Sequence, residues 1–375
     1  MIYIHIPFCR SFCTYCDFYS EVAFDCHGRY ASALCAEIRS RASEISPEIN
    51  TLYIGGGTPS VLPLSVLESV METLRSVGHG APYSEFTVEV NPDDIVRKGP
   101  EYVEGLLRLG VSRISMGVQS FDDGILKWMN RRHDSATALK AYSILEDAGV
   151  PDISIDLIFG MPQLSEALWA ETLDKALSIS SRGNLPHHIS SYQLSVEPGS
   201  ALAGMVERGQ WSEASDEQCE RQYAMLCDVL AKAGYSHYEI SNFALPGHEA
   251  VHNSAYWSHH PYTGFGPAAH SFLRPVRSWN TSDLHAYMSA AESGDFSSVV
   301  NSEVLDSDQL ALETVMLALR TSAGISEATL RSCCSPAAVA AALAAGSLTT
   351  GPDGTLRIPE SRFFISDSII SDLIC

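Results

Sequence analysis

Short runs of β-branched and aromatic residues alternate with longer amphipathic segments through the first 240 residues of the chain. The short runs predict strands over 2–6, 51–54, 85–90, 113–116, 152–157, 188–194 and 237–240. The longer segments predict helices over 30–45, 63–77, 134–148, 166–179 and 216–233. Because strands and helices alternate, the pattern predicts an α/β fold with a parallel sheet and helices outside it, in the form of a partial (β/α) barrel.

Polar residues and glycines stand where several of the predicted strands end. Gly55, Glu89, Gln119 and Asp156 occupy such positions. In a parallel α/β barrel the active site lies at the carboxyl ends of the strands. The loop after the first predicted strand belongs to the same end, so we expect these residues and that loop to form one site.

The pattern changes in the last third of the chain. A stretch rich in His, Tyr, Trp and Gly covers 244–300 and predicts irregular structure with short strands over the barrel. Asp306 and Gln309 resemble a helix-capping pair, and Leu312, Met316 and Leu319 then fall on one helical face. Helices are predicted over 327–333 and 336–345, and a hairpin over 348–356. We therefore expect a barrel over 1–245, an extension over 246–300 and a small winged-helix-like C-terminal domain over 301–375.

Composition and charge exclude several classes of function. The chain has 375 residues, with 45% hydrophobic and 18% charged residues, as in a soluble globular protein. The net charge of −21 argues against nucleic-acid binding, and residues 301–375 hold only 4 Lys+Arg against 9 Asp+Glu, which favours a structural or lid role for that domain. No apolar run reaches the roughly 18 residues of a membrane-spanning helix. With ten cysteines and no signal-peptide pattern, the chain is expected in the reducing cytoplasm.

Three cysteines follow the first predicted strand with the spacing of a metal-cluster loop. Cys9, Cys13 and Cys16 offer three thiolates in one short segment, where Phe18 occupies the place of a nearby fourth. A four-iron cluster takes four ligands, so one iron would remain open to another molecule. The alternatives are a zinc site, for which His5 is a conceivable fourth ligand, and a cluster completed by Cys26.

Six motifs, counting the cysteine segment, resemble the radical S-adenosylmethionine (SAM) superfamily. They are YIHIPFC at 3–9, GGGTP at 55–59, EVNP at 89–92, GVQSF at 117–121, IDLIFG at 155–160 and SYQL at 191–194. The resemblance covers nearly the whole chain. It is to the branch that contains oxygen-independent coproporphyrinogen III dehydrogenase and the HemW heme chaperones.

Three features separate these two relatives. The dehydrogenase carries a further Cys two residues after its triad, where this chain has Phe18, and it has an N-terminal extension before the position of Tyr3. The segments HNSAYW at 252–257 and GFGPAAH at 264–270 resemble the HemW pattern. The resemblance therefore implies a heme chaperone; the alternatives are radical oxidative decarboxylation of porphyrinogen propionates and radical SAM chemistry on an unrelated substrate.

The resemblance also implies a set of cofactors and ligands. Cys9, Cys13 and Cys16 would hold a [4Fe-4S] cluster whose open iron binds the methionine part of SAM. The residues that match SAM-contacting positions are Gly56, Gly57, Thr58, Glu89, Gln119, Arg131 and Asp156. Tyr3 and Tyr15 match positions near the cluster, with core packing as an equal alternative.

His252 is the leading candidate for a heme ligand, because imidazole is a common axial ligand of heme iron. The alternative is a hydrogen-bonded structural histidine. The implied partners are heme, an unidentified heme-acceptor protein and an electron donor. Neither nucleic acid nor an integral membrane segment is expected.

Overall fold

A curved, mostly parallel sheet forms the centre of the computed structural model, which describes residues 1–48, 50–80 and 82–374. Its order is β7-β8-β6-β5-β4-β3-β2-β1-β9, so the sheet is open between β7 and β9. The strands are β1 (Ile2–Ile6), β2 (Thr51–Gly56), β3 (Glu85–Val90), β4 (Arg113–Gln119), β5 (Asp152–Phe159), β6 (His188–Gln193), β7 (Ser236–Glu239), β8 (Asn242–Ala244) and β9 (Thr263–Phe265). This arrangement confirms the predicted α/β fold.

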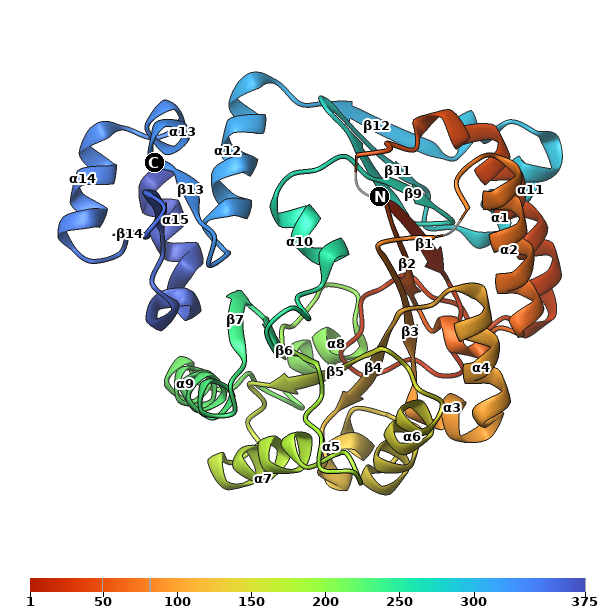
Figure 1. The fold of residues 1–375 in the computed structure, drawn as a ribbon, viewed down its shortest axis with the longest axis horizontal. Coiled ribbons are helices and arrows are strands. Elements are labelled where there is room, and N and C mark those ends of the chain that lie inside the picture. The colour runs from red at the N-terminus through yellow and green to blue at the C-terminus, as the bar shows by residue number, and fades with distance from the viewer. Residues whose placement is uncertain (49, 81, 375) are drawn as a thin grey trace.

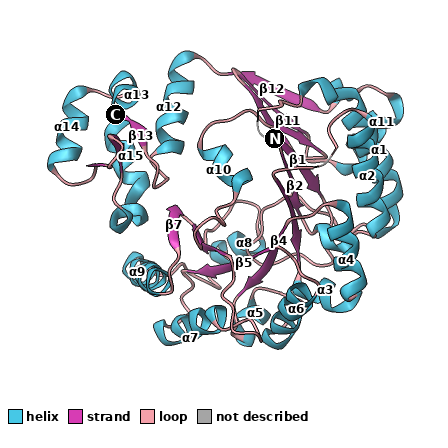
Figure 2. Ribbon diagram, viewed as in Figure 1, coloured by secondary structure: helices cyan, strands magenta, loops and turns pink. Residues whose placement is uncertain are grey.

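Helices cover the outer side of the curved sheet (Figures 1 and 2). They are α1 (His27–Arg41), α2 (Leu64–Ser76), α3 (Pro92–Lys98), α4 (Pro100–Leu109), α5 (Asp123–Trp128), α6 (Ser135–Asp147), α7 (Glu166–Leu177) and α9 (Asp216–Lys232). The short helix α8 (Ala201–Glu207) lies instead against the loop that follows β1, where Leu202 N–H donates to Thr14 O at 2.8 Å. The five predicted helices are present. Sequence analysis missed α3, α4, α5 and α8, which have six to ten residues each and therefore show few turns of helical periodicity.

The core lies between the sheet and these helices. Ile4, Ile54, Val88, Ile114 and Ile155, one from each of the strands β1 to β5, are all fully buried. Strands covered on both faces bury apolar side chains in near-continuous runs. The apolar run of β5 therefore continues to Phe159. The sequence had indicated that Asp156 stands at the end of this strand, whereas the structure places it inside the strand.

The sheet departs from a purely parallel arrangement at β8. This strand runs antiparallel to both β6 and β7. Sequence analysis predicted the strand that became β7 but missed β8, which has only three residues. The two strands are joined by a tight turn, with a register irregularity between His237 and Glu239.

The segment after β8 contributes to the main sheet and also forms a second one. Helix α10 (Val251–Trp257) precedes β9, which pairs parallel with β1 through Ile2–Thr263 and Ile4–Phe265. A three-stranded antiparallel sheet follows, of β10 (His270–Leu273), β11 (Val276–Asn280) and β12 (Val300–Val304), with α11 (Leu284–Ser293) between the last two strands. The main sheet is thus completed only by residues far along the chain.

The C-terminal region is small and mainly helical, and it packs against one edge of the barrel, where the ring of Phe364 lies 5.4 Å from that of Tyr223 in α9 and the ring of Phe363 lies 5.0 Å from that of His237 in β7. It contains α12 (Ser307–Ala318), β13 (Ile325–Ser326), α13 (Glu327–Cys333), α14 (Pro336–Ala344), β14 (Thr349–Thr350), β15 (Thr355–Arg357) and α15 (Ser366–Ile374). The side chains of Asp306 and Gln309 form the predicted capping box. The buried face of α12 carries Leu310 and Val315, whereas Leu312 and Met316 are only half-buried.

Among the residues that the structure describes, none of the helices is both long enough and apolar enough to span a lipid bilayer.

Candidate cofactor site at the cysteine loop

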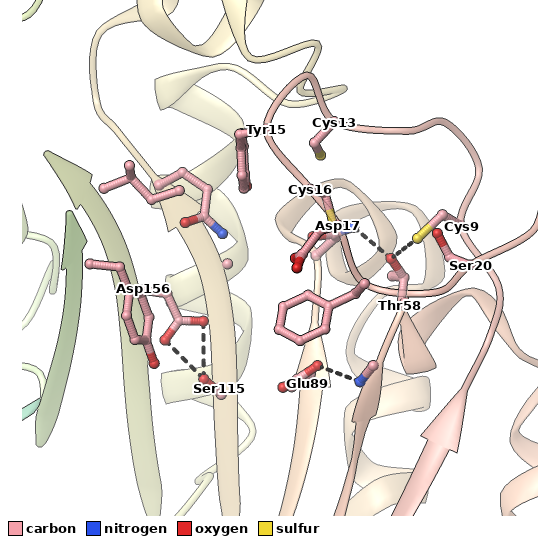
Figure 3. A pocket seen from close by; sticks show the side chains of 18 of the residues that line it. Cys9, Cys13, Tyr15, Cys16, Asp17, Ser20, Thr58, Glu89, Ser115 and Asp156 are labelled. Carbon is pink, nitrogen blue, oxygen red and sulfur yellow. Dashed lines mark hydrogen bonds between the residues drawn. The ribbon is translucent and has the colours of Figure 1, made fainter. Parts of the chain in front are cut away.

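The three cysteines lie on an irregular loop that leaves the carboxyl end of β1. Backbone hydrogen bonds hold both flanks of this loop: Cys9 N–H donates to Glu21 O at 3.0 Å, and Thr14 N–H donates to Met129 O at 3.1 Å. Cys9, Cys13 and Cys16 all line one cavity of about 1110 Å³, which lies at the carboxyl ends of the strands and extends along the sheet (Figure 3). The structure therefore brings the loop and the strand ends together around one cavity.

The donor set fits a three-cysteine cluster better than a single zinc ion. Among the described residues, the three sulfur atoms do not gather within 4.8 Å of one another, whereas two thiolates on one tetrahedral zinc, with Zn–S of about 2.3 Å, would lie only about 3.8 Å apart.

The candidates for a fourth ligand are engaged elsewhere. His5 Nε2 bonds to Tyr19 O at 2.9 Å, its Nδ1 bonds to the Tyr3 hydroxyl at 3.0 Å, and Cys26 Sγ donates to the Ala23 carbonyl. Phe18 is 65% exposed and supplies no ligand atom.

Gly56 and Gly57 let the chain pass close to the cysteine loop. Gly56 has φ of +104°, a conformation that favours glycine, and a Cβ there would meet the His5 ring at 2.6 Å. A Cβ on Gly57 would meet the carbonyl oxygens of Phe8 and Ile6 at 2.8 and 2.9 Å. The next residue, Thr58, then brings its hydroxyl to 3.3 Å from Cys9 Sγ.

Glu89 is a carboxylate that the protein holds in place beside the cavity. Its Oε1 accepts a 2.7 Å hydrogen bond from the Tyr53 hydroxyl. Its Oε2 accepts one of 3.0 Å from Gly56 N–H, which is the dashed line at Glu89 in Figure 3. Burial raises the pKa of Glu89 to about 7, although these two hydrogen bonds oppose the shift. A cation that entered the cavity would stabilise the ionised form.

Asp156 is the second carboxylate in the cavity. Both of its oxygens accept from the Ser115 hydroxyl, at 3.0 and 3.2 Å. Burial raises the pKa of Asp156 to about 6, while the hydrogen bond from Ser115 and the positive charge of Arg131 lower it. The two carboxylates together give the cavity the chemistry to hold a cationic group or a set of hydroxyls.

Arg131 links the cysteine loop to the strand ends. Its Nη1 donates to Cys13 Sγ at 3.4 Å, and its Nη2 donates to Asn91 Oδ1 and Gly117 O, both at 2.6 Å. Asn91 in turn donates from Nδ2 to the Thr58 hydroxyl at 3.2 Å. The Nε atom of Arg131 is buried without a hydrogen-bond partner among the described residues, so it is a donor that a ligand in the cavity can use.

The structure brings most of the predicted site residues together. Those that line the cavity are Cys9, Cys13, Tyr15, Cys16, Gly56, Gly57, Thr58, Glu89, Gln119, Arg131 and Asp156. Tyr3 does not line it and bonds instead to His5. Sequence reasoning missed Tyr53, Asn91 and Ser115, although Asn91 stands inside the EVNP segment that had been singled out.

His252 lies in α10 and is almost completely buried, at 1% exposure. Its Nδ1 bonds to the Thr51 hydroxyl at 2.8 Å and its Nε2 to the Tyr256 hydroxyl at 3.2 Å. Burial lowers the pKa of His252 to about 3, so the ring is neutral. The next residue, Asn253, lines the cavity, whereas His252 packs behind Tyr53 with the ring centroids 5.1 Å apart. Axial ligation by Nε2 would require its bond to Tyr256 to break.

Three comparisons bear on this site. Residues 3–176 match the radical SAM superfamily. The heme chaperone HemW of Lactococcus lactis is 35% identical over 325 residues, which cover 86% of this chain and 82% of the relative. HemW of Bacillus subtilis is 34% identical over 328 residues, covering 87% and 84%. The structure of coproporphyrinogen III oxidase from Escherichia coli, a radical SAM enzyme, has a TM-score of 0.82 at 20% identity, covering 100% of this chain and 89% of that one.

Proposed function

The chain belongs to the radical SAM superfamily and, within it, to the family of the HemW heme chaperones, and on this basis we propose that it binds heme and transfers it to acceptor proteins. In this proposal it also carries a [4Fe-4S] cluster with SAM. The cluster would need an electron donor if its redox state changes. The proposed compartment is the cytoplasm.

In this proposal the cluster is held by Cys9, Cys13 and Cys16. When bound, a cluster of this class supplies a single electron to the sulfonium of SAM and an open iron for the methionine part of the same molecule. The protein would position the cluster and SAM and shield them. Arg131 contributes by placing its guanidinium 3.4 Å from the Cys13 sulfur, where it offsets thiolate charge.

The remaining cavity residues would bind SAM by charge and by hydrogen bonds. Glu89 and Asp156 supply acceptors for cationic and hydroxyl groups, and the free Nε of Arg131 supplies a donor for a carboxylate. Gly56 and Gly57 allow close approach of the backbone, while Thr58 and Gln119 offer further polar groups. Tyr15 would cover the cluster, and Tyr3 would act only indirectly, through His5.

One observation supports heme binding in the same chamber. The cavity that holds the cysteines extends to Ala250 and Asn253, at the start of α10. His252, the proposed heme ligand, therefore lies one residue from the cavity wall. Its neutral ring is the form that binds iron, and its Nε2 is bonded to the hydroxyl of Tyr256.

A heme titration of anaerobically reconstituted protein, followed by absorbance, tests this proposal. Saturation at one heme per chain with a shifted Soret band is expected, together with transfer of heme to an apo-acceptor protein. Coproporphyrinogen III is incubated in parallel with SAM and a reductant. Decarboxylation without specific heme binding would overturn the chaperone proposal in favour of the dehydrogenase.

A further inference from the structure

A second cluster of potential metal ligands lies at the opposite end of the barrel, outside the cysteine cavity. Asp152 is the first residue of β5, His187 immediately precedes β6, and His248 lies in the loop between β8 and α10. One ligand atom from each residue lies within 4.8 Å of the other two. Their side chains are 16%, 32% and 34% exposed, so an ion can reach them from solvent.

Asp152 Oδ1 is a buried acceptor without a donor in this cluster, and His187 Nδ1 lies beside it. Ile153 N–H donates to His187 Nδ1 at 3.2 Å, so this nitrogen is an acceptor. It lies 3.9 Å from Asp152 Oδ1, which is buried and has no hydrogen-bond partner among the described residues. A buried acceptor without a donor is costly, and a cation bound between the two atoms is one group that would satisfy Asp152 Oδ1.

His248 supplies a third donor atom at the same place. Its Nδ1 lies 2.9 Å from Asp152 Oδ2, and its ring stacks on that of His187 with the centroids 4.5 Å apart. The hydrogen bond from Ile153 N–H already requires His187 Nδ1 to be unprotonated, as a metal ligand must be. Ligation through Nδ1 would require the tautomer of His248 that carries its proton on Nε2.

The local charge also permits a cation. Arg113 lies 3.0 Å from Asp152 Oδ2, but its Nε also lies 3.1 Å from Glu85 Oε2. One guanidinium thus faces two carboxylates, and the group retains a net negative charge. The same Arg113 donates to the His248 carbonyl at 2.8 Å, which fixes the loop that carries the third ligand.

We propose that Asp152, His187 and His248 bind one divalent transition-metal ion of the zinc class. Two imidazoles and one carboxylate are ligands that zinc prefers, and a three-residue set leaves one position for water or another donor. The 3.2 Å hydrogen bond from Ile153 N–H to His187 Nδ1 would be given up. The ion would join β5, the start of β6 and the loop that leads into α10, and the site does not depend on heme binding.

The test is a zinc titration that separates this site from the cysteines. Protein with its cluster reconstituted is freed of loose metal and titrated with Zn²⁺ by calorimetry, and the bound metal is counted by elemental analysis. A variant with Cys9, Cys13 and Cys16 all changed to Ser is titrated in the same way. Both are expected to bind one Zn²⁺ per chain. With Co²⁺ as the probe, the triple variant is expected to show weak d–d bands without sulfur-to-metal charge transfer.

Substitutions identify the ligands. His248→Ala and His187→Ala are expected to weaken Zn²⁺ binding by at least roughly tenfold, since even the loss of an outer-shell partner of a metal site costs about 10–100-fold. His285→Ala, which removes an exposed histidine on α11, serves as the matched control and is expected to bind as the wild type does. Zinc binding that is absent from the triple-serine variant, or that is unchanged in both histidine variants, would overturn the proposal.

Discussion

The hydroxyl of Tyr53 donates a 2.7 Å hydrogen bond to Oε1 of Glu89. Tyr53 comes from β2 and Glu89 from β3, so neighbouring strands combine to fix one carboxylate at the cavity wall. The bond favours the ionised form of Glu89, while burial disfavours it and raises its pKa to about 7. The charge of this side chain therefore changes near neutral pH.

The first prediction concerns SAM binding. Because the ionised carboxylate of Glu89 attracts a cationic ligand, the affinity for SAM is expected to rise as pH increases through about 7. Glu89→Gln is expected to lower the affinity at pH 8 by roughly 10- to 100-fold, the range for a hydrogen bond to a charged group. Anaerobic equilibrium binding between pH 6 and 8 measures both effects.

Tyr53→Phe provides the matched comparison for this prediction. It removes the hydrogen bond that lowers the pKa of Glu89 and keeps the ring that packs on His252. The pH dependence of SAM binding is expected to move to higher pH. If the Tyr53→Phe curve coincides with that of the wild type, Glu89 does not control the dependence.

The second prediction concerns the cluster. Cys13→Ser is expected to abolish stable [4Fe-4S] binding, because two cysteines remain and none of the neighbouring candidates is free to replace the third. Cys26→Ser is the control, since Cys26 Sγ donates to the Ala23 carbonyl instead of facing the cavity. Iron and sulfide content and the visible spectrum after anaerobic reconstitution measure the outcome. Full iron content in Cys13→Ser would refute the three-cysteine assignment.

The third prediction concerns the proposed heme ligand. The Tyr256 hydroxyl occupies His252 Nε2, so Tyr256→Phe is expected to strengthen heme binding by freeing that nitrogen. His252→Ala is expected to weaken it by at least tenfold, with a changed Soret band. Heme titration of both variants measures the two opposite changes in heme affinity. An unchanged affinity and spectrum in both would leave His252 as a structural residue that supports β2 through Thr51.

The fourth prediction concerns stability and lies outside the site. Glu239 in β7 is fully buried, its Oε1 has no hydrogen-bond partner among the described residues, and burial raises its pKa to about 7. A raised carboxyl pKa stabilises the fold below the unfolded pKa of about 4.5, and that stability is lost as pH rises through about 7.

Glu239→Gln is therefore expected to change the free energy of unfolding differently at the two pH values. Relative to the wild type, the variant gains roughly 1–3 kcal/mol more at pH 8 than at pH 5. Urea unfolding at the two pH values measures the difference. Glu207→Gln, at an exposed position, serves as the control and is expected to change neither midpoint. Equal effects of Glu239→Gln at both pH values would show that its carboxyl does not titrate between them.

Local patterns in the sequence predict the barrel strands and the longer helices because each buries an apolar stripe along its own length. Ile2–Ile6 and Glu85–Val90 match their predicted strands at both ends. The capping pair Asp306 and Gln309 is equally local, and it was predicted correctly. Short elements such as β8 carry too few residues to show a period, and their place is set by partners elsewhere in the chain.

Site residues were predictable where motifs mark strand ends, and unpredictable where function depends on neighbours across the sheet. In the sequence, Tyr53 is an ordinary aromatic residue of a predicted strand. Its role depends on Glu89 of the neighbouring strand β3, which accepts its hydrogen bond. The proposed zinc site likewise could not be predicted from the sequence, because Asp152, His187 and His248 come from three separate segments. Sequence alone also did not reveal that both nitrogens of His252 are already bonded.

The pairing of β1 with β9 has a consequence for the order of events during synthesis. β1 leads directly into the cysteine loop. One of its two neighbouring strands, however, is β9, which consists of Thr263 to Phe265. At roughly 5–20 residues per second, the ribosome needs about ten to fifty seconds between the two. During that interval one edge of β1 lacks its hydrogen-bonding partner. Delivery of iron and sulfide to the cysteines is therefore expected to follow completion of the sheet and not to accompany the emergence of the loop.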